Sequence, residues 1–148
     1  MNWIEELKKF KIQTPISVRY NDLDTLKHVN NATYLVYLEE ARVHYAKQVL
    51  GWNGDLNQLD MLLAHVKVDF LLPIFLNSPL VIHTRVNKIG NKSFEMEYLL
   101  VIEEIERKLA AKANTVLVYY DMRMQQTAPI PENLRNAILD FEGEDVLT

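Results

Sequence analysis

A long helical pattern followed by strand patterns is the feature that most constrains how this chain of 148 residues can fold. From Asn31 to Leu50, apolar residues recur at the spacing of one helix face. Asn30 or Asn31 can cap the start of this helix, and Gly51 stands where a helix commonly ends. The apolar face is broad enough to be largely buried, and it comprises Tyr34, Tyr37, Leu38, Ala41, Tyr45 and Val49.

The second half of the chain alternates apolar and polar residues, which is typical of strands with one buried face. The runs are 61–72, 79–89, 93–103 and 109–122, and Gly90-Asn91 is a turn signal between two of them. Strands that follow one another through short turns indicate an antiparallel sheet.

Shorter elements are expected on both sides of this pattern. Asn2 caps a first helix, with Glu5 as its capping-box partner and Trp3, Leu7 and Phe10 on one face. Pro15 ends that helix and a strand follows over 16–20. A closing helix runs from Pro131 to Gly143.

Together these elements predict one α+β domain over residues 1–148. An antiparallel sheet of about five strands would wrap around one long central helix, because that helix must bury its apolar face. The other sheet face and the edge strand need cover, so we expect a homodimer or a larger homo-oligomer.

Composition excludes several classes of function. The chain has 16 Lys and Arg against 20 Asp and Glu, without the clustered basic surface typical of nucleic-acid binding. It has no Cys, which excludes disulfides and thiolate chemistry, and its scattered histidines suggest no metal site and no cofactor. The apolar run 70–76 is broken by Pro73 and is far shorter than the ~20 residues of a membrane span. With no signal-peptide pattern at the start, we expect a cytoplasmic protein without membrane contact.

The segment just before the main helix carries the chemistry. It holds Asp22, Asp24, His28, Asn30 and Asn31 within ten residues. A helix N-terminus offers unpaired N–H groups and a partial positive charge, which stabilise an oxyanion. A carboxylate beside it can act as a base or a nucleophile. This combination suits hydrolysis of an activated acyl group.

The same segment resembles the active-site segment of hot-dog-fold acyl-CoA thioesterases, in particular the 4-hydroxybenzoyl-CoA thioesterase-like family. Weaker resemblances lie at Val68-Asp69-Phe70 with Pro73-Ile74 and at the turn from Ile89 to Phe94, so that the match spans roughly residues 14–122. The residues that carry it are Arg19-Tyr20-x-Asp22-x-Asp24, His28-Val29-Asn30-Asn31-Ala32-x-Tyr34 and Tyr37-Leu38-Glu39-Glu40-Ala41-Arg42. The resemblance implies the hot-dog fold and hydrolysis of acyl-CoA to free acid and CoA.

The family's functional residues transfer to this sequence position by position. The resemblance places the catalytic carboxylate at Asp24 and the oxyanion donor at the backbone N–H near Asn31. It implies two sites per dimer at the subunit interface, a pantetheine tunnel between subunits, and in many members a tetramer made of two dimers. Lys27 stands where this family often has glycine, so we expect its side chain either to alter the loop or to contact the ligand.

Each residue of the segment also has a local structural interpretation. Asp24 can form an Asx turn with its own backbone, and Asp22 is expected to bind loop amides or to orient Arg19 or His28. His28 either positions substrate or water and polarises the carbonyl, or bonds a backbone carbonyl. Asn30 and Asn31 are helix caps or substrate contacts.

Four further residues are weaker candidates for substrate contacts. Tyr34 belongs to the helix core or lines the pocket. Asn91, Lys92 and Ser93 form a hairpin turn that, by the resemblance, approaches the CoA.

Three other functions remain open at this point. An acyl-carrier-protein thioesterase would use the same chemistry on another carrier. A hot-dog hydratase or dehydratase would need an acid/base set for the α and β carbons, and no comparable His/Glu pairing is found. A non-catalytic acyl-CoA-binding module would bind without releasing thiol. The residues do not decide between nucleophile and general base, nor do they indicate the acyl chain.

Overall fold

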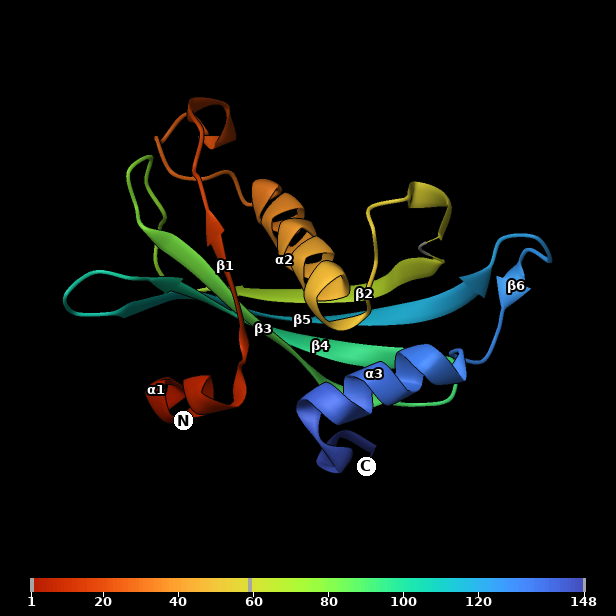
Figure 1. Ribbon diagram of the computed structural model, residues 1–148. Coiled ribbons are helices and arrows are strands. Elements are labelled where there is room, and N and C mark those ends of the chain that lie inside the picture. Colours follow the sequence, from red (N-terminus) through yellow and green to blue (C-terminus); the bar gives the residue numbers. More distant parts are fainter. Residues whose placement is uncertain (1, 59, 148) are drawn as a thin grey trace.

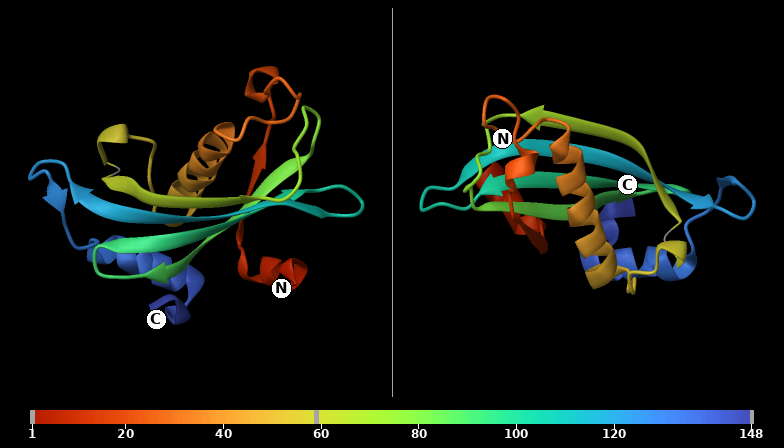
Figure 2. Two further views of the ribbon diagram at one scale, coloured as in Figure 1. Left: turned by 180° about the vertical axis from the view of Figure 1, so that it is seen from behind. Right: turned by 90° about the horizontal axis from the view of Figure 1, so that it is seen from above.

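A curved antiparallel sheet with one long helix lying across it forms the centre of the protein, shown by a computed structural model that describes residues 2–58 and 60–147 (Figures 1 and 2). The strand order is β1-β3-β4-β5-β2, and a two-residue strand, β6, pairs with β5. The expected domain bounds, Met1 and Thr148, lie outside the described residues. The predicted hot-dog architecture is confirmed. The strands are β1 (Ile12–Ile16), β2 (Met61–Phe70), β3 (Leu80–Ile89), β4 (Ser93–Ile102), β5 (Lys108–Asp121) and β6 (Gln126–Thr127).

The helices follow the predicted order with small shifts of their ends. The long central helix is α2 (Thr33–Val49), and Gly51 follows it with a φ of 71°, a backbone conformation that favours glycine. The remaining helical elements are α1 (Trp3–Glu6), α3 (Glu132–Glu142) and the short 3₁₀ turns η1 (Leu7–Lys9), η2 (Tyr20–Asp22), η3 (Leu56–Gln58) and η4 (Glu144–Leu147).

The apolar face of α2 is buried against the sheet, as its periodicity predicts. Five of its six predicted members are at most 3 % exposed, and Val49 is half-buried. They join one hydrophobic core with the inward side chains of β3, β4 and β5. Small residues in β5 (Ala110, Ala111 and Ala113) are buried in the same core. The wide apolar face therefore fixes the helix on the sheet.

The first strand is not where the sequence predicts it. The prediction of a strand over 16–20 is wrong, because β1 ends at Ile16 and contains Pro15. β1 is an edge strand, where a residue without an N–H is tolerated, and its side chains alternate between buried and exposed. The strand order also departs from a simple meander, since β2 pairs with β5 at the opposite edge.

The N-terminal segment covers the outer face of the sheet. Leu7 and Phe10 form a second apolar cluster with Leu99 and Val101, and Trp3 packs against it, as the predicted face requires. Asn2 caps α1 by accepting the Ile4 N–H at 3.2 Å. The predicted capping box is incomplete, because the Glu5 carboxylate pairs with Lys8 at 3.0 Å instead.

A carboxylate at the end of α3 ties this helix to the core. Oε2 of Glu142 accepts the Tyr45 hydroxyl at 2.9 Å and the Val86 N–H at 2.8 Å. Burial raises the pKa of Glu142, because loss of hydration disfavours the charged form more than these two donors favour it. Ionisation of Glu142 therefore opposes folding.

Replacing Glu142 with Gln should make stability less sensitive to pH. The folded-state pKa lies above the unfolded one, so the wild-type protein loses stability as the pH rises through the folded pKa. The Gln amide oxygen can accept the same two donors without ionising. The free energy of unfolding of Glu142→Gln, minus that of wild type, should therefore increase between pH 4 and pH 7 in urea titrations. A constant or falling difference would contradict this account.

Candidate active site

The loop between β1 and α2 is folded back on itself and held against the β2–β3 connection. Leu23 and Val29 form an isolated antiparallel bridge, and the Asp24 N–H donates to the His28 carbonyl at 2.8 Å. The Val29 N–H donates to the Ile74 carbonyl at 2.8 Å. Figure 1 shows this loop at the upper end of α2 beside the β2–β3 connection. The polar segment singled out in the sequence is thus a closed turn at the start of the helix.

Asp22 is the structural acid of this turn. It is 3 % exposed, and its carboxylate accepts the Tyr37 hydroxyl at 2.6 Å and the Arg19 N–H at 2.9 Å. Burial alone would raise its pKa, but the hydrogen bonds from Tyr37 and Arg19 hold the pKa of Asp22 below its usual value. The prediction that Asp22 bonds loop groups and Arg19 is confirmed.

Asp24 is the more accessible acid. Its Oδ1 accepts the Leu26 N–H at 2.8 Å and the His28 N–H at 3.3 Å, which is the Asx turn expected from its local sequence. No hydrogen bond within the described residues uses Oδ2. The turn therefore orients the carboxylate through one oxygen and leaves the other available.

The start of α2 also leaves one amide available. Asn30 acts as the cap, because its Oδ1 accepts the Ala32 N–H at 2.9 Å and its carbonyl accepts the Thr33 N–H at 2.9 Å. Asn31 lies between these positions, and among the described residues its own N–H donates to no acceptor. A free N–H in the first turn of a helix is suited to bind a developing negative charge.

These groups meet at one cavity of about 280 Å³. Asp24, His28, Asn31 and Tyr34 all line it, so the structure brings together four of the predicted site residues. Its other walls are Val29 and the run from Phe70 to Pro73. The role of 70–73 as a wall was not predicted. The only signal was the weak family match around Phe70 and Pro73.

Two aromatic contacts involve residues that line this cavity. The His28 ring meets Phe75 edge-on at 5.2 Å, and Tyr34 meets Phe70 edge-on at 4.9 Å between ring centroids. Burial raises the pKa of Tyr34 to about 12, so its phenol stays protonated near neutral pH. Tyr34 is both helix core and cavity wall, as the two interpretations of this residue allowed.

Asp24 also lines a second cavity, of about 770 Å³. It is lined by Tyr20, Leu23, Lys27 and Glu104, together with residues 75–79. Lys27 has a φ of 65°. The glycine that the resembling family often has at this position would adopt this conformation without strain, whereas Lys27, which lines the cavity, adopts it at a cost.

Comparison with known proteins decides the family. The model of the thioesterase-like superfamily matches residues 18–138. The chain belongs to the thioesterase-like superfamily. Because relatives over most of its length are named thioesterases, the chain is a thioester hydrolase.

Individual relatives agree with this assignment. A thioesterase from Thermus thermophilus, crystallised with coenzyme A and zinc, is 34 % identical, with a TM-score of 0.80 over 93 % of this chain and 98 % of that chain. The long-chain acyl-CoA thioesterase FadM of Escherichia coli K12 is 27 % identical over 137 residues, which are 86 % of this chain and 96 % of FadM. The probable thioesterase YbaW of Escherichia coli is 26 % identical, with a TM-score of 0.71 over 93 % of this chain and 99 % of that chain.

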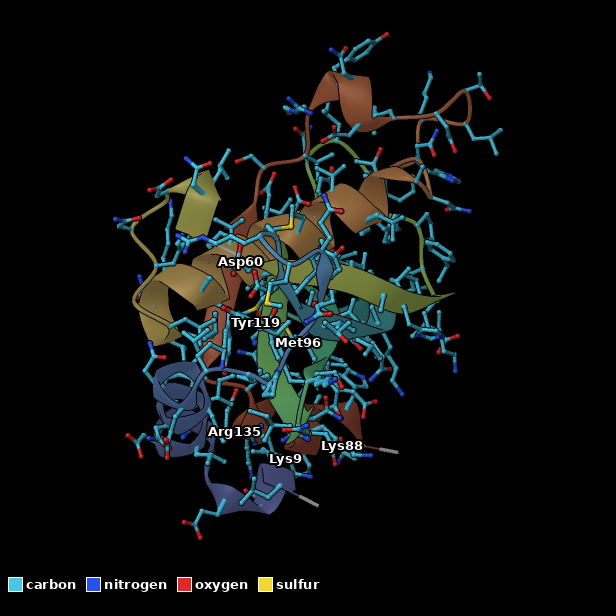
Figure 3. The ribbon with its side chains drawn as sticks, turned by 90° about the vertical axis from the view of Figure 1, so that its right-hand side faces the viewer. Lys9, Asp60, Lys88, Met96, Tyr119 and Arg135 are labelled. Atoms are coloured by element: carbon cyan, nitrogen blue, oxygen red, sulfur yellow. The ribbon has the colours of Figure 1, made fainter. Side chains whose placement is uncertain are left out.

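Within one subunit of this thioesterase, the β3–β4 turn lies far from Asp24. Asn91, Lys92 and Ser93 are at the opposite end of β3, about 30 Å along a ten-residue strand. Arg135 of α3, labelled in Figure 3, donates to the carbonyls of Gly90 and Asn91 and fixes this turn. The expected hairpin turn is confirmed, and its approach to CoA stays a prediction.

Two general properties of the described residues bear on the expected partners. Among residues 2–58 and 60–147, no three His, Asp or Glu side chains gather as a possible metal site. In the same part of the chain, no helix is long and apolar enough to cross a bilayer.

Tyr37→Phe should destabilise the protein by about 1.5–3 kcal/mol, the range for a buried hydrogen bond to a charged group. Because the folded-state pKa of Asp22 is lowered, the stability it contributes is lost as the pH falls through that pKa. The gap between wild type and variant should therefore narrow below about pH 4. Chemical unfolding at several pH values measures this, and a pH-independent gap would contradict it.

Lys27→Gly should stabilise the protein by up to about 1 kcal/mol, because glycine relieves the strain at positive φ but has a more flexible unfolded chain. Lys27→Ala is the matched control, since it removes the ammonium group and keeps the strain. Urea unfolding should rank the Gly variant above the Ala variant. Equal stabilities would show that positive φ carries no cost here.

Proposed function

We propose that this thioesterase hydrolyses acyl-CoA to free acid and CoA, with Asp24 as the catalytic carboxylate and the Asn31 N–H as the oxyanion donor. The observation that carries the proposal is that both residues line one cavity, Asp24 with an available oxygen and Asn31 with an available amide. A reacting carbonyl placed between them would meet a base or nucleophile and an oxyanion donor together.

The relatives support acyl-CoA as the substrate class. FadM is named a long-chain acyl-CoA thioesterase, and the Thermus structure is a complex with coenzyme A. Both relatives match more than four-fifths of this chain. Competition with an acyl-carrier-protein substrate would separate the two carriers.

Hydrolysis of a thioester needs little acid catalysis from the protein, because a thiolate is a good leaving group. In one route Asp24 attacks the thioester carbonyl, the C–S bond breaks to release CoA thiolate, and water hydrolyses the resulting mixed anhydride. In the other route Asp24 takes a proton from a water molecule as that water attacks the carbonyl; the C–S bond then breaks, and the leaving CoA thiolate takes up the proton from Asp24. The Asn31 N–H, at the positive end of α2, stabilises the oxyanion in both routes.

The remaining polar residues orient the substrate in this proposal. His28 is at the wall of the same cavity and can position the thioester carbonyl or the water. Asn30 holds the helix start in place through its cap, so its contribution to binding is indirect. Asn91, Lys92 and Ser93 contact CoA only if a second subunit brings them to the site.

The exposed edge of the sheet supports a homodimer. β2 is ten residues long, and no described strand pairs with its outer edge. Its Leu62, Leu63 and Phe70 are 46 %, 42 % and 47 % exposed, although an edge strand of this length and apolarity normally needs cover. Twofold pairing of β2 with a second β2 would cover it, and association of two such dimers would give a tetramer.

Asp24→Asn and Asp24→Ala should lower kcat for acyl-CoA by about 100-fold or more, the size of a lost acid–base or nucleophilic group. A thiol-release assay over short, long and aromatic acyl-CoAs measures this, and binding of a non-hydrolysable acyl-CoA analogue should stay within a few-fold of wild type. Asp140→Asn is the control, because this exposed α3 residue undergoes the same charge change. Near wild-type turnover by Asp24→Ala would refute the role of Asp24.

A further inference from the structure

The hydroxyl group of Tyr37 connects the main helix to the loop that carries Asp24. It donates to Oδ2 of Asp22 at 2.6 Å, and both residues are at most 3 % exposed. The same oxygen accepts the Arg19 N–H at 2.9 Å, and the Arg19 guanidinium donates to the other oxygen at 3.2 Å. Hydrogen bonds to a charged group are roughly twice as strong as those between neutral groups. This contact therefore holds the loop against one point on the helix.

Asp22 also contacts the segment that leads into the helix. The Asn30 N–H donates to the Asp22 carbonyl at 2.8 Å, directly before Asn31. Asp24 follows Asp22 by two residues. Asp22 is thus bonded through its side chain to α2 and through its backbone to the residue before Asn31. The carboxylate and the amide of the proposed site are therefore both tied to one residue.

The hydrophobic core holds Tyr37 itself in place. Tyr37 lies four residues after Thr33, the first residue of α2, which is about 6 Å along the helix axis. Its side chain is among the largest fully buried ones of the described residues, and side chains packed at this density have little freedom to move. Burial and the bond to Asp22 raise the pKa of the Tyr37 hydroxyl, so it remains a donor near neutral pH. The loop is thus fixed to the core through this hydroxyl.

The proposed reaction depends on the separation between two groups that this contact holds. The thioester carbonyl lies between the Asp24 carboxylate and the Asn31 N–H, so both groups have to keep their places. A misplacement of about 1 Å can lower the rate of a reaction on the order of 100-fold. Binding of the substrate depends on the whole cavity, including its wall at 70–73, and is less sensitive to this one separation.

We propose that Tyr37 is a positioning residue for the reaction. Through Asp22, its hydroxyl sets the separation between the Asp24 carboxylate and the Asn31 amide. This inference rests on the proposed function. Because Tyr37 acts through Asp22 and not by contact with the substrate, its effect falls on kcat rather than on substrate affinity.

Tyr37→Phe tests this role, and Tyr45→Phe is its matched control. Both tyrosines belong to α2, both are 2 % exposed, and both hydroxyls donate to a carboxylate. The acceptor of Tyr45 is Glu142 of α3, at 2.9 Å, and Tyr45 lies eight residues further along the helix, which is about 12 Å. Loss of the Tyr45 hydroxyl therefore weakens the same core without releasing the loop.

Tyr37→Phe should lower kcat for acyl-CoA by about 10- to 100-fold, the effect of a small misplacement of reacting groups. The Kd of a non-hydrolysable acyl-CoA analogue should stay within about threefold of wild type, because the cavity walls are unchanged. Tyr45→Phe should keep kcat within about twofold, although it also loses stability. Urea unfolding shows that each variant is folded at the assay temperature.

Substitutions of Asp22 separate position from charge. The amide oxygen of Asp22→Asn can accept the Tyr37 and Arg19 donors without a charge, so this variant should keep kcat within about fivefold. Asp22→Ser is too short to reach Tyr37 and should lose as much as Tyr37→Phe; it also replaces that variant if Tyr37→Phe does not fold. The double variant should be no slower than the slower parent, because both changes break the same bond. An equal loss in Asp22→Asn and Asp22→Ser would show that Asp22 acts by its charge, which would overturn the proposal.

Amide hydrogen exchange measures the position of the loop directly. The Asn30 N–H, which donates to the Asp22 carbonyl, should exchange about tenfold faster in Tyr37→Phe, because the loop opens more often. Tyr45→Phe should leave the exchange of this amide unchanged. Equal exchange in wild type and Tyr37→Phe would contradict the proposal.

The results separate this inference from the proposed function. If wild type releases thiol from no acyl-CoA, or if Asp24→Ala keeps wild-type turnover, the proposed function fails. If turnover depends on Asp24 but folded Tyr37→Phe keeps the wild-type kcat, or Tyr45→Phe loses as much, the proposed function stands and the positioning role of Tyr37 is overturned.

Discussion

The burial of α2 against the sheet is the constraint on which the rest of the structure depends. Its tyrosines each bury on the order of 200 Å² and are held at almost no exposure, so the helix cannot slide or rotate without breaking the core. The position of its N-terminus is therefore set by packing several residues away. Because Asn31 and the cap of Asn30 lie at that N-terminus, the free amide of the candidate site is placed by the hydrophobic core rather than by the loop.

Asp22 and Asp24, which are separated in sequence by one residue, have different roles because their surroundings differ. Asp22 is buried and saturated by Tyr37 and Arg19, so it joins the loop to the helix. Asp24 is half-buried and satisfied through one oxygen. An acid that is fully hydrogen-bonded is a poor nucleophile and a weak base, whereas an oriented acid with an available oxygen keeps its reactivity. The pair shows how a short polar turn can hold its shape and still present a reactive carboxylate.

Local patterns predict those parts of this fold that are determined locally. The helix over 31–50 and the strands of the second half follow from periodicity, and the face of β4 from Phe94 to Ile102 is buried as its alternation indicates. Pro15 misled the assignment of β1, because proline ends a helix but is also accepted on an edge strand, and edge position is a property of the whole sheet. The strand that pairs with β2 could not be predicted for the same reason. The alternation of apolar and polar residues indicates which face of a strand is buried, but it does not indicate which strand lies beside it.

The candidate site also has a part that the local sequence predicts and a part that depends on distant residues. The polar segment and the helix start are adjacent in sequence, so their meeting is predictable. The wall formed by 70–73 comes from a distant strand end, and only the family resemblance pointed there. The positive φ of Lys27 had a signal in that resemblance, because a family glycine often marks a backbone conformation that other residues adopt at a cost. The predicted contact of Asn91, Lys92 and Ser93 with CoA would need a second subunit, because within one chain they lie at the far end of β3 from Asp24.

The strand β2 joins these conclusions into one argument. A ten-residue apolar edge strand would favour aggregation of a monomer, because its free N–H and C=O groups can pair with a strand of another molecule. Lys67 and Asp69 add charges to this strand, and such charges disfavour indiscriminate pairing at an exposed edge. Since Phe70 at one end of β2 lines the Asp24 cavity, a partner strand paired with β2 would lie beside this cavity, and the dimer contact would help to shape the substrate site.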